Sequence, residues 1–311
     1  MTQTAAMIGA GLIGRSWAMV FARAGWRVRL YDSVPAQLDA ARGHIEAGLT
    51  EQQAYGLAHD AAAAAARVTY VANLDDALTG VDWVQENAPE VLDVKRELYP
   101  RIDRAAPPTA IIASSTSGIP ASRFTERLAG RARCLVAHPV NPPHLVPVVE
   151  LCGAPWTDPA AVERARTVMS GIGQVPITVK RELDGFIVNR LQGALLSEAM
   201  RLVGEGYVSP QDLDKTVQDG LGLRWSFIGP FATIELNAPG GVADYCARYG
   251  PIYRALAENP PSPAVWDAAK VQHVASQLEP LTADERDART HWRDVRLLSL
   301  RRHKRNEPDP T

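Results

Sequence analysis

The glycine-rich segment near the start of the chain places the strongest constraint on the fold. A short apolar run, Ala5 to Ile8, leads directly into Gly9-Ala10-Gly11-Leu12-Ile13-Gly14, and a helix-like run, Arg15 to Ala24, follows. In such a strand–turn–helix unit, the first glycine permits the tight turn, the second lets a pyrophosphate approach the backbone, and the third lets the helix pack closely on the strand. Amides at the start of the helix then face the phosphates. The motif alone is weak support for dinucleotide binding, but its setting here is the required one.

A second predicted strand, Arg27 to Tyr31, ends at Asp32, which lies 18 residues after Gly14. A carboxylate at this point can accept hydrogen bonds from the adenosine ribose and repels a 2′-phosphate, so the pattern favours NAD over NADP. The alternative is that Arg27 or Arg29 binds a phosphate, but both lie within the strand before Asp32. We therefore expect the glycine segment and Asp32 to bind NAD.

Strand-like and helix-like segments alternate along the first part of the chain, and helices alone follow. The expected strands after the first two are Val68–Val71, Val81–Gln85, Ala110–Ala113, Cys134–Ala137, a strand carrying Glu150, and Val175–Val179. The helical segments between them are Pro35–Ala66, Leu74–Leu78, Val91–Ala105, one begun by Pro120, and Pro159–Gly171. The later helices are expected at Asp184–Glu205, Pro210–Leu221, Phe231–Tyr249, Pro263–Leu278 and Ala283–Arg305.

This change of pattern predicts an α/β fold in two domains. An N-terminal Rossmann dinucleotide-binding domain would span residues 1–181, with the boundary near Arg181, and an all-helical C-terminal domain would span residues 182–311. A chain of 311 residues with 46% hydrophobic residues is long enough for two such domains. Within the second domain, the arginine-rich helix end, Arg301 to Arg305, is interpreted as a solvated terminus that suits the helix dipole.

Charge and cysteine content exclude several classes of function. A net charge of −2 gives no electrostatic basis for binding nucleic acid or an acidic membrane. The three cysteines, Cys134, Cys152 and Cys246, are far apart and match no metal-ligand spacing, so we expect reduced packing residues. The sequence shows neither a leader pattern nor an apolar run of membrane-spanning length, which predicts a soluble, cytoplasmic protein.

The segment Ala137 to Leu151 carries the candidate catalytic pair. The strand that begins at Cys134 stops at His138, beside a proline, and Glu150 returns on a second apolar strand. This layout allows one carboxylate to lie against one imidazole. Such a carboxylate fixes the tautomer of a histidine and strengthens it as a base, which suits proton removal from an alcohol. The alternative is a packed strand end with a surface histidine.

Two further polar segments follow predicted strands at the edge where open α/β sheets bind ligands. The first, Glu86 to Glu90, leads to Lys95, and we expect Glu90 and Lys95 to contact the nicotinamide end of the cofactor. Solvated helix charges are an equally weighted alternative for both. The second, Ser114 to Gly118, is rich in hydroxyl groups, and its serines are also suited to capping the following helix.

Four motifs together give a specific resemblance that covers almost the whole chain. GAGLIG, SSTSG, AHPVNPP with VPVVEL, and DGFIVNRL occur in the order and spacing of the L-3-hydroxyacyl-CoA dehydrogenase superfamily. The segment Gln218 to Trp225 and the following Phe227 to Pro230 resemble the branch that contains L-gulonate 3-dehydrogenase and lambda-crystallin. One departure is His144, where animal members carry a tyrosine.

The resemblance implies an NAD-dependent dehydrogenase with assigned roles. His138 would be the general base, Glu150 its orienting partner, and Ser117 and Asn189 donors to the substrate oxygen as it becomes a carbonyl. A positioned base is typically worth about 10² to 10⁴ in rate, and a donor to developing charge about 10² to 10³. These groups can polarise the oxygen without a metal ion.

The sequence leaves the substrate open between a small 3-hydroxy acid and a hydroxyacyl-CoA thioester. The family places CoA contacts on the helical segment after the second strand, but residues Ala41 to Ala66 contain no lysine and only one arginine, Arg42. That composition is poor for a polyphosphate ligand. A free acid needs one cation for its carboxylate, and Arg224, in a loop of the second domain, is the candidate. The alternative is that Arg224 is an ordinary surface arginine that does not bind the substrate.

Other classes are less well supported. A crystallin-like structural protein or NAD sensor would not need His138 and Glu150, and both are present. A beta-hydroxyacid dehydrogenase would need a lysine within Asp184 to Leu191, and none occurs there. The second domain is also rich in apolar residues near Arg224, among them Trp225 and Phe231, so we expect a homodimer formed through the helical domain, as the resemblance also implies.

Overall fold

The computed structural model describes residues 2–307, which form two compact units. The first contains residues 2–189 together with residues 289–307, and the second contains residues 190–288. The division therefore falls after Asn189 rather than near Arg181, and the end of the last helix belongs to the first unit. Its arginines explain this: Arg301 donates to the carbonyl oxygen of His144 at 3.2 Å, and the Arg302 guanidinium lies 5.5 Å from the centre of the Tyr55 ring.

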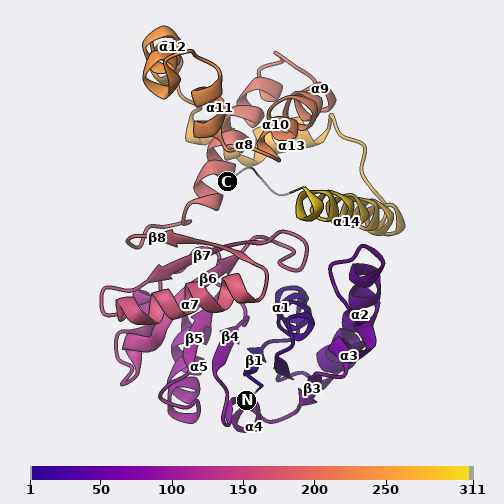
Figure 1. The fold of residues 1–311 in the computed structure, drawn as a ribbon. Helices are drawn as coiled ribbons and strands as arrows, with labels where there is room; N and C mark the ends of the chain where they lie inside the picture. Colours follow the sequence, from indigo (N-terminus) through magenta and orange to yellow (C-terminus); the bar gives the residue numbers. More distant parts are fainter. Residues whose placement is uncertain (1, 308–311) are drawn as a thin grey trace. The chain divides into compact units, whose positions relative to one another are not determined.

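The first unit is built on one eight-stranded sheet with the strand order β3-β2-β1-β4-β5-β6-β7-β8. All neighbouring strands are parallel except β6 and β7, which pair antiparallel. The strands are β1 (Thr4–Ile8), β2 (Arg27–Tyr31), β3 (Val68–Val71), β4 (Trp83–Glu86), β5 (Ile111–Ser114), β6 (Cys134–Pro139), β7 (Val148–Gly153) and β8 (Val175–Val179). The order reverses between β1 and β4, which is where such sheets bind ligands (Figure 1). The predicted Rossmann architecture is confirmed.

Helices cover both faces of this sheet because successive strand residues point to opposite sides. Ala5 and Met7 of β1 pack with one group of helices, α1 (Leu12–Arg23), α2 (Pro35–Ala54), α3 (Ala61–Ala65) and α7 (Pro159–Gly171). Ala6 and Ile8 pack with the other group, α4 (Leu74–Leu78), α5 (Leu92–Ala105) and α6 (Ser122–Thr125). A short 3-10 turn, η1 (Arg131–Arg133), precedes β6. The central strands β4, β5 and β6 are buried along their full length, so their ends are held rigidly.

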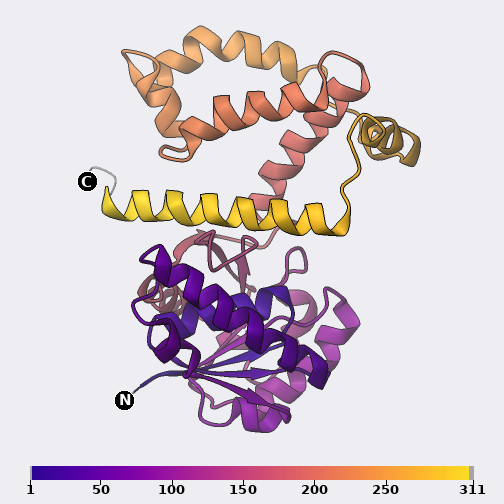
Figure 2. The ribbon, with the colours of Figure 1, turned by 90° about the vertical axis from the view of Figure 1, so that its right-hand side faces the viewer.

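The second unit consists of helices, as expected. Its elements are most of α8 (Val188–Gly204), α9 (Pro210–Lys215), a π-helical turn η2 (Thr216–Gly222), α10 (Leu223–Trp225), α11 (Pro230–Leu236), α12 (Gly241–Ala257), η3 (Pro263–Trp266) and α13 (Ala268–Ala275). The last helix, α14 (Ala283–Asn306), begins in this unit, and from Arg289 it belongs to the first, where it lies beside α2 (Figure 2). A contact of 3.5 Å between His291 Nδ1 and Glu51 Oε1 joins the two helices.

Several helix boundaries differ from those expected from the sequence. The predicted helix Pro35–Ala66 is interrupted between α2 and α3, and the predicted helix Phe231–Tyr249 is interrupted between α11 and α12, where Gly241 has a φ of 69°. The helix expected from Asp184 begins only at Val188, because Gly185 and Phe186 adopt φ values of 75° and 46°. A left-handed backbone cannot continue a right-handed helix.

Two of the expected packing roles for cysteine are confirmed and one is wrong. Cys134 and Cys152 are buried in the sheet, whereas Cys246 is exposed on α12, and none of the three forms a disulfide. Arg301, expected to be solvated, is half-buried, since it reaches the carbonyl groups of the first unit. Among residues 2–307, no helix has the length and apolar character that crossing a membrane requires.

Candidate functional site

The glycine turn after β1 has the geometry that an approaching pyrophosphate needs. A Cβ at Gly14 would lie 1.8 Å from the carbonyl oxygen of Gly9, and one at Gly9 would lie 2.7 Å from the carbonyl oxygen of Asn87. No side chain fits at either position. At Gly11, in contrast, no atom other than those of Gly11 and its two chain neighbours lies within 4 Å of the place that a Cβ would take, so this part of the turn is open. Leu12 and Ile13 begin α1, and their amides have no acceptor within the helix.

Asp32 closes the same site from the end of β2. Its Oδ2 accepts from the backbone N–H of Ala10 at 2.7 Å, and its Oδ1 accepts from that of Val34 at 2.9 Å. Each oxygen keeps a lone pair for a ribose hydroxyl. A cavity of about 640 Å³ lies here, and Gly9, Gly11 and Asp32 line it. The residues present therefore fit an adenine dinucleotide.

Arg29, the alternative phosphate ligand, is engaged elsewhere. Its Nη1 donates to the carbonyl oxygen of Asp76 at 3.0 Å and to that of Thr79, both at the α4 side of the sheet. The guanidinium is therefore held at the carbonyl end of a helix, where a cation is favoured. Arg27 is exposed at the start of β2, at the other end of the strand from Asp32.

His138 and Glu150 face each other across the antiparallel pair of β6 and β7. Their backbone positions are directly opposite in the register, and His138 Nδ1 lies 2.7 Å from Glu150 Oε2. The imidazole is 5% exposed and the carboxylate 0%, which excludes a surface histidine. Burial by itself raises the pKa of Glu150, but hydrogen bonds from His138 and from the backbone of Val188 and Ile187 outweigh it, and the net pKa lies below its usual value.

The other oxygen of Glu150 connects this pair to the start of α8. Oε1 accepts from the backbone N–H of Ile187 at 2.8 Å and from that of Val188 at 3.0 Å. Asn189 comes next in the chain, and its Nδ2 donates to the carbonyl oxygen of Ser117 at 2.7 Å. A continuous path of hydrogen bonds and covalent backbone therefore joins His138, Glu150, Asn189 and Ser117.

Glu90 holds the other side of the Ser117 backbone. Its Oε1 accepts from the N–H of Ser117 and the N–H of Gly118, both at 3.0 Å, and from the hydroxyl of Thr116 at 2.6 Å. The hydroxyl-rich turn is thus fixed by a carboxylate. None of the serines in this turn caps α6, because the N-cap position of that helix makes no side-chain hydrogen bond. Ser117 itself is exposed.

Lys95 is neither solvated nor unpaired. Its side chain is 1% exposed, and Nζ lies 2.9 Å from both oxygens of Glu86 and 3.8 Å from Glu90 Oε2. Ser114 donates a third bond to Glu86 at 2.6 Å. The solvated alternative is therefore wrong for Lys95, because a buried ammonium needs a buried carboxylate. Contact of Glu90 and Lys95 with the cofactor stays a prediction.

His144, on the loop between β6 and β7, has surroundings that differ from those of His138. Its carbonyl oxygen accepts from Arg23 at 2.9 Å and from Arg301, and its Nδ1 is buried without a hydrogen-bond partner. Burial, and then the charge of Arg23, lower the pKa of His144 to about 3, so the ring is neutral at physiological pH. The residue therefore serves as a packing group that anchors its loop.

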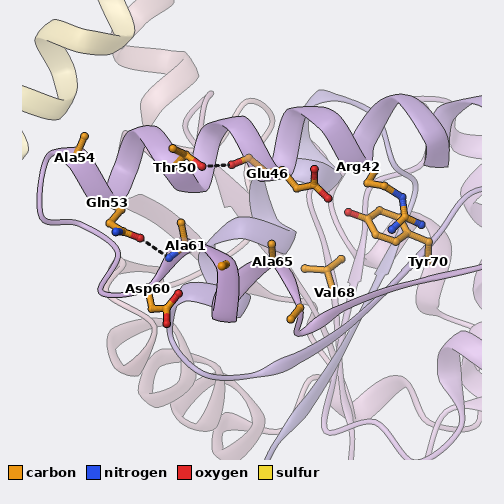
Figure 3. Close-up of a pocket in the computed structure, with 12 residues that line it drawn as sticks. Arg42, Glu46, Thr50, Gln53, Ala54, Asp60, Ala61, Ala65, Val68 and Tyr70 are labelled. Carbon is orange, nitrogen blue, oxygen red and sulfur yellow. Dashed lines mark hydrogen bonds between the residues drawn. The ribbon is translucent and has the colours of Figure 1, made fainter.

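A second cavity, of about 1010 Å³, lies between α2, α3 and β3 (Figure 3). One cation, Arg42, lines it together with the carboxylates of Glu46 and Asp60, and alanines form much of its wall. The Arg42 guanidinium lies 4.1 Å from the centre of the Tyr70 ring, in a cation–π contact. This cavity therefore offers little positive charge to a phosphorylated ligand.

Arg224 belongs to the second unit, in α10, and its side chain is exposed. The structure thus links His138, Glu150, Asn189, Ser117, Glu90 and Lys95 through hydrogen bonds, ion pairs and backbone within the first unit. It places Gly9, Gly11 and Asp32 on the wall of one cavity, which the segment before Glu90 also lines. Within residues 2–307, no group of three or more acidic, histidine or cysteine side chains is placed to hold a metal ion.

Sequence reasoning missed two residues that shape the site. Glu86 is the buried partner of Lys95, and a carboxylate directly after the predicted strand Val81–Gln85 was the available signal. Phe186, in the turn before α8, lies 5.6 Å from His138 between ring centres. The Asp184-Gly185 pair, which disfavours a helix start, was the available signal there.

Comparison with known proteins gives matches along nearly the whole chain. A family model described as 3-hydroxyacyl-CoA dehydrogenase, NAD binding domain, matches residues 4–182. A second, described as 3-hydroxyacyl-CoA dehydrogenase, C-terminal domain, matches residues 185–274.

Individual relatives are similar over nearly their full length. Lambda-crystallin of Oryctolagus cuniculus is 41% identical, over 96% of this chain and 95% of that protein. L-carnitine dehydrogenase of Pseudomonas putida is 35% identical, over 96% and 92%. The solved structure of 5-formyl-3-hydroxy-2-methylpyridine 4-carboxylic acid 5-dehydrogenase, an NAD⁺-dependent dismutase, has a TM-score of 0.86 and 30% identity and covers 97% of this chain and 98% of that one. With the glycine turn, Asp32 and the family models in agreement, the chain belongs to the 3-hydroxyacyl-CoA dehydrogenase family and is an NAD-dependent oxidoreductase that acts on CH–OH groups.

Proposed function

We propose that the protein oxidises the 3-hydroxyl of a small free 3-hydroxy acid resembling L-gulonate to the 3-keto acid. The observation that carries this proposal is the buried contact of 2.7 Å between His138 Nδ1 and Glu150 Oε2. With Nδ1–H donating to the carboxylate, Nε2 carries a free lone pair and is the atom that accepts the hydroxyl proton. NAD, when bound, supplies the acceptor for the hydride.

Ser117 and Asn189 are proposed to donate to the substrate oxygen. Within residues 2–307 the Ser117 hydroxyl makes no hydrogen bond, and its backbone is held at both ends by Glu90 and Asn189. The Asn189 amide uses one N–H on the Ser117 carbonyl and retains a second. Donors held in this way need little rearrangement when charge develops on the oxygen.

A free carboxylate on the substrate is the second element of the proposal. Arg224 supplies a guanidinium that is exposed on α10 and suited to binding both carboxylate oxygens. The name L-carnitine dehydrogenase among the relatives favours this class, because carnitine is itself a 3-hydroxy acid with a free carboxylate. Carnitine would also need a partner for its quaternary ammonium group.

The alternative substrate is an L-3-hydroxyacyl-CoA thioester such as 3-hydroxybutyryl-CoA. The cavity between α2 and α3 argues against it, since Arg42 is the one cation among its lining residues and two carboxylates stand beside it. Several phosphates would meet a surface with little positive charge. A crystallin-like protein without turnover is the non-enzymatic alternative. It gives no reason to keep a carboxylate and a histidine buried together, which is otherwise costly.

Replacing Arg224 by Ala tests the choice of substrate. Activity on L-gulonate should fall by about 2 to 5 kcal/mol of transition-state stabilisation if the guanidinium and carboxylate pair is desolvated. Any thioester activity should change much less, because a thioester has no carboxylate at that position. Arg254, exposed on α12, is the matched control, and Arg254→Ala should retain activity on both substrates. An Arg224→Ala enzyme with unchanged use of L-gulonate would exclude the assigned role.

We also propose that the protein acts in the cytoplasm as a homodimer joined through the second unit. Large apolar side chains are exposed there, with Phe231 at 75%, Leu236 at 73% and Leu223 at 62%. Few side chains of this unit are fully buried, Val203 and Val265 among them. Burying the exposed residues against a second copy would stabilise the helices.

A further inference from the structure

The turn that leads into α8 has an unusual backbone. Gly185 has a φ of 75°, and Phe186, with a φ of 46°, is the one residue other than glycine with positive φ in the described part of the chain. A bulky side chain in the left-handed region is disfavoured and persists only when its surroundings impose it. The structure must therefore supply contacts that hold Phe186 in this conformation.

Those contacts lie at the candidate catalytic pair. The Phe186 side chain is 0% exposed, and its ring lies 5.6 Å from the His138 ring at an interplanar angle of 36°. Its N–H donates to the carbonyl oxygen of Leu183 at 3.2 Å, which closes the turn. Directly after it, the amides of Ile187 and Val188 donate to Glu150 Oε1. One residue thus contacts the imidazole through its side chain and directs the next two amides toward the carboxylate.

We propose that Phe186 is a positioning residue for the His138–Glu150 pair. Its buried ring packs against the imidazole and anchors the left-handed turn, and the anchored turn presents two N–H groups to Glu150. Glu150 is then held from both sides, by these amides at Oε1 and by His138 at Oε2. The inference rests on the proposed function insofar as His138 is the base, but the geometry that it concerns is independent of the substrate.

Removal of the ring has a specific consequence for Glu150. Without its anchor, the turn relaxes toward an ordinary backbone, and the amides of Ile187 and Val188 no longer face the carboxylate. Burial, which by itself raises the pKa of Glu150, is then opposed by fewer hydrogen bonds. The pKa of Glu150 should rise, and the carboxylate should hold the imidazole less firmly.

Carbon-13 NMR titration of the Glu150 carboxyl group measures this effect without any substrate. The full-length NAD complex is used, and the signal is assigned by its absence in Glu150→Gln. The pKa of Glu150 should rise in Phe186→Ala and rise less in Phe186→Leu, which keeps a buried apolar side chain. Phe21 is buried among tryptophans elsewhere in the first unit, so Phe21→Leu is the matched control and should leave the titration unchanged. A Phe186→Leu protein keeps the test available if Phe186→Ala does not fold.

A double-mutant cycle supplies the kinetic test. Phe186→Ala should lower kcat about tenfold or more while leaving NADH affinity unchanged, and the same change in a Glu150→Gln background should cost about threefold or less. The proposal is overturned if Glu150 titrates in the Phe186 variants as in the wild type, or if Phe186→Ala has its full effect without Glu150. Full activity of Glu150→Gln alone would instead count against the proposed function, and the NMR titration would still decide the role of Phe186.

Discussion

Replacing Glu150 by Gln should abolish most of the activity through a change of histidine tautomer. Gln has nearly the shape of Glu, so the buried site should remain filled. Two backbone amides, from Ile187 and Val188, donate toward Oε1, and only the carbonyl oxygen of Gln can accept from them. Its NH₂ group must therefore face His138 Nδ1, where the carboxylate oxygen stood at 2.7 Å. An N–H facing Nδ1 requires Nδ1 to accept, which places the proton of the neutral ring on Nε2.

Two effects contribute to the loss, and their magnitudes differ. A buried hydrogen bond to a charged group contributes about 1.5 to 3 kcal/mol, or roughly 10- to 150-fold. A protonated Nε2 cannot accept the substrate proton, which removes general-base catalysis worth about 10² to 10⁴. The tautomer change is the larger effect, so we expect kcat to fall by about 100-fold or more.

The assay is NADH formation from a saturating hydroxy acid, with NADH binding measured in parallel by fluorescence. Binding should remain near that of the wild type, because Glu150 is not among the residues that line the cavity at the glycine turn and Asp32. A Glu150→Gln enzyme with kcat within about threefold of the wild type would refute the argument, since neither the tautomer nor the charge would then matter.

Three further outcomes follow from the same structure. Because the Asp32 carboxylate repels a 2′-phosphate, the catalytic efficiency with NAD should exceed that with NADP by at least about tenfold, and equal use of the two would be inconsistent with this geometry. The pKa of Glu150 in the folded protein lies below the ordinary value of 4.5. The ionised carboxylate therefore contributes fully to the free energy of unfolding above pH 4.5, and this contribution is lost as the pH falls through the lower pKa of the folded protein. The melting temperature should therefore fall more steeply between about pH 6 and pH 3 for the wild type than for Glu150→Gln. Parallel curves of melting temperature against pH would count against this role of Glu150. Light scattering at micromolar concentration should give the mass of a dimer, and a monomer would exclude pairing through the second unit.

The sequence predicts the sheet well because its signals are local. The glycine turn, the strand Arg27–Tyr31 and the position of Asp32 all depend on short-range rules of turn geometry and apolar patterning. The facing of His138 and Glu150 was also predictable, because two apolar strands joined by a short proline-rich loop pair antiparallel in a defined register.

Features that depend on how separate elements pack against each other were not predictable in this way. The burial of Lys95 requires Glu86 on another element, and the left-handed Phe186 is imposed by packing on His138. The return of α14 to the first unit depends on carbonyl groups such as that of His144, more than 150 residues earlier, to which Arg301 donates. The break before α12 is an exception, since Pro239-Gly240 is a local turn signal.

The substrate panel tests the central claim most directly. Free 3-hydroxy acids, L-gulonate and L-carnitine among them, and the thioester 3-hydroxybutyryl-CoA are each supplied with NAD, and NADH formation is followed for the wild type and for His138→Ala. We expect turnover of a free acid, little or none of the thioester, and a loss of about 10² to 10⁴ in His138→Ala with NADH affinity nearly unchanged. Robust turnover of 3-hydroxybutyryl-CoA with none of the free acids would contradict the account.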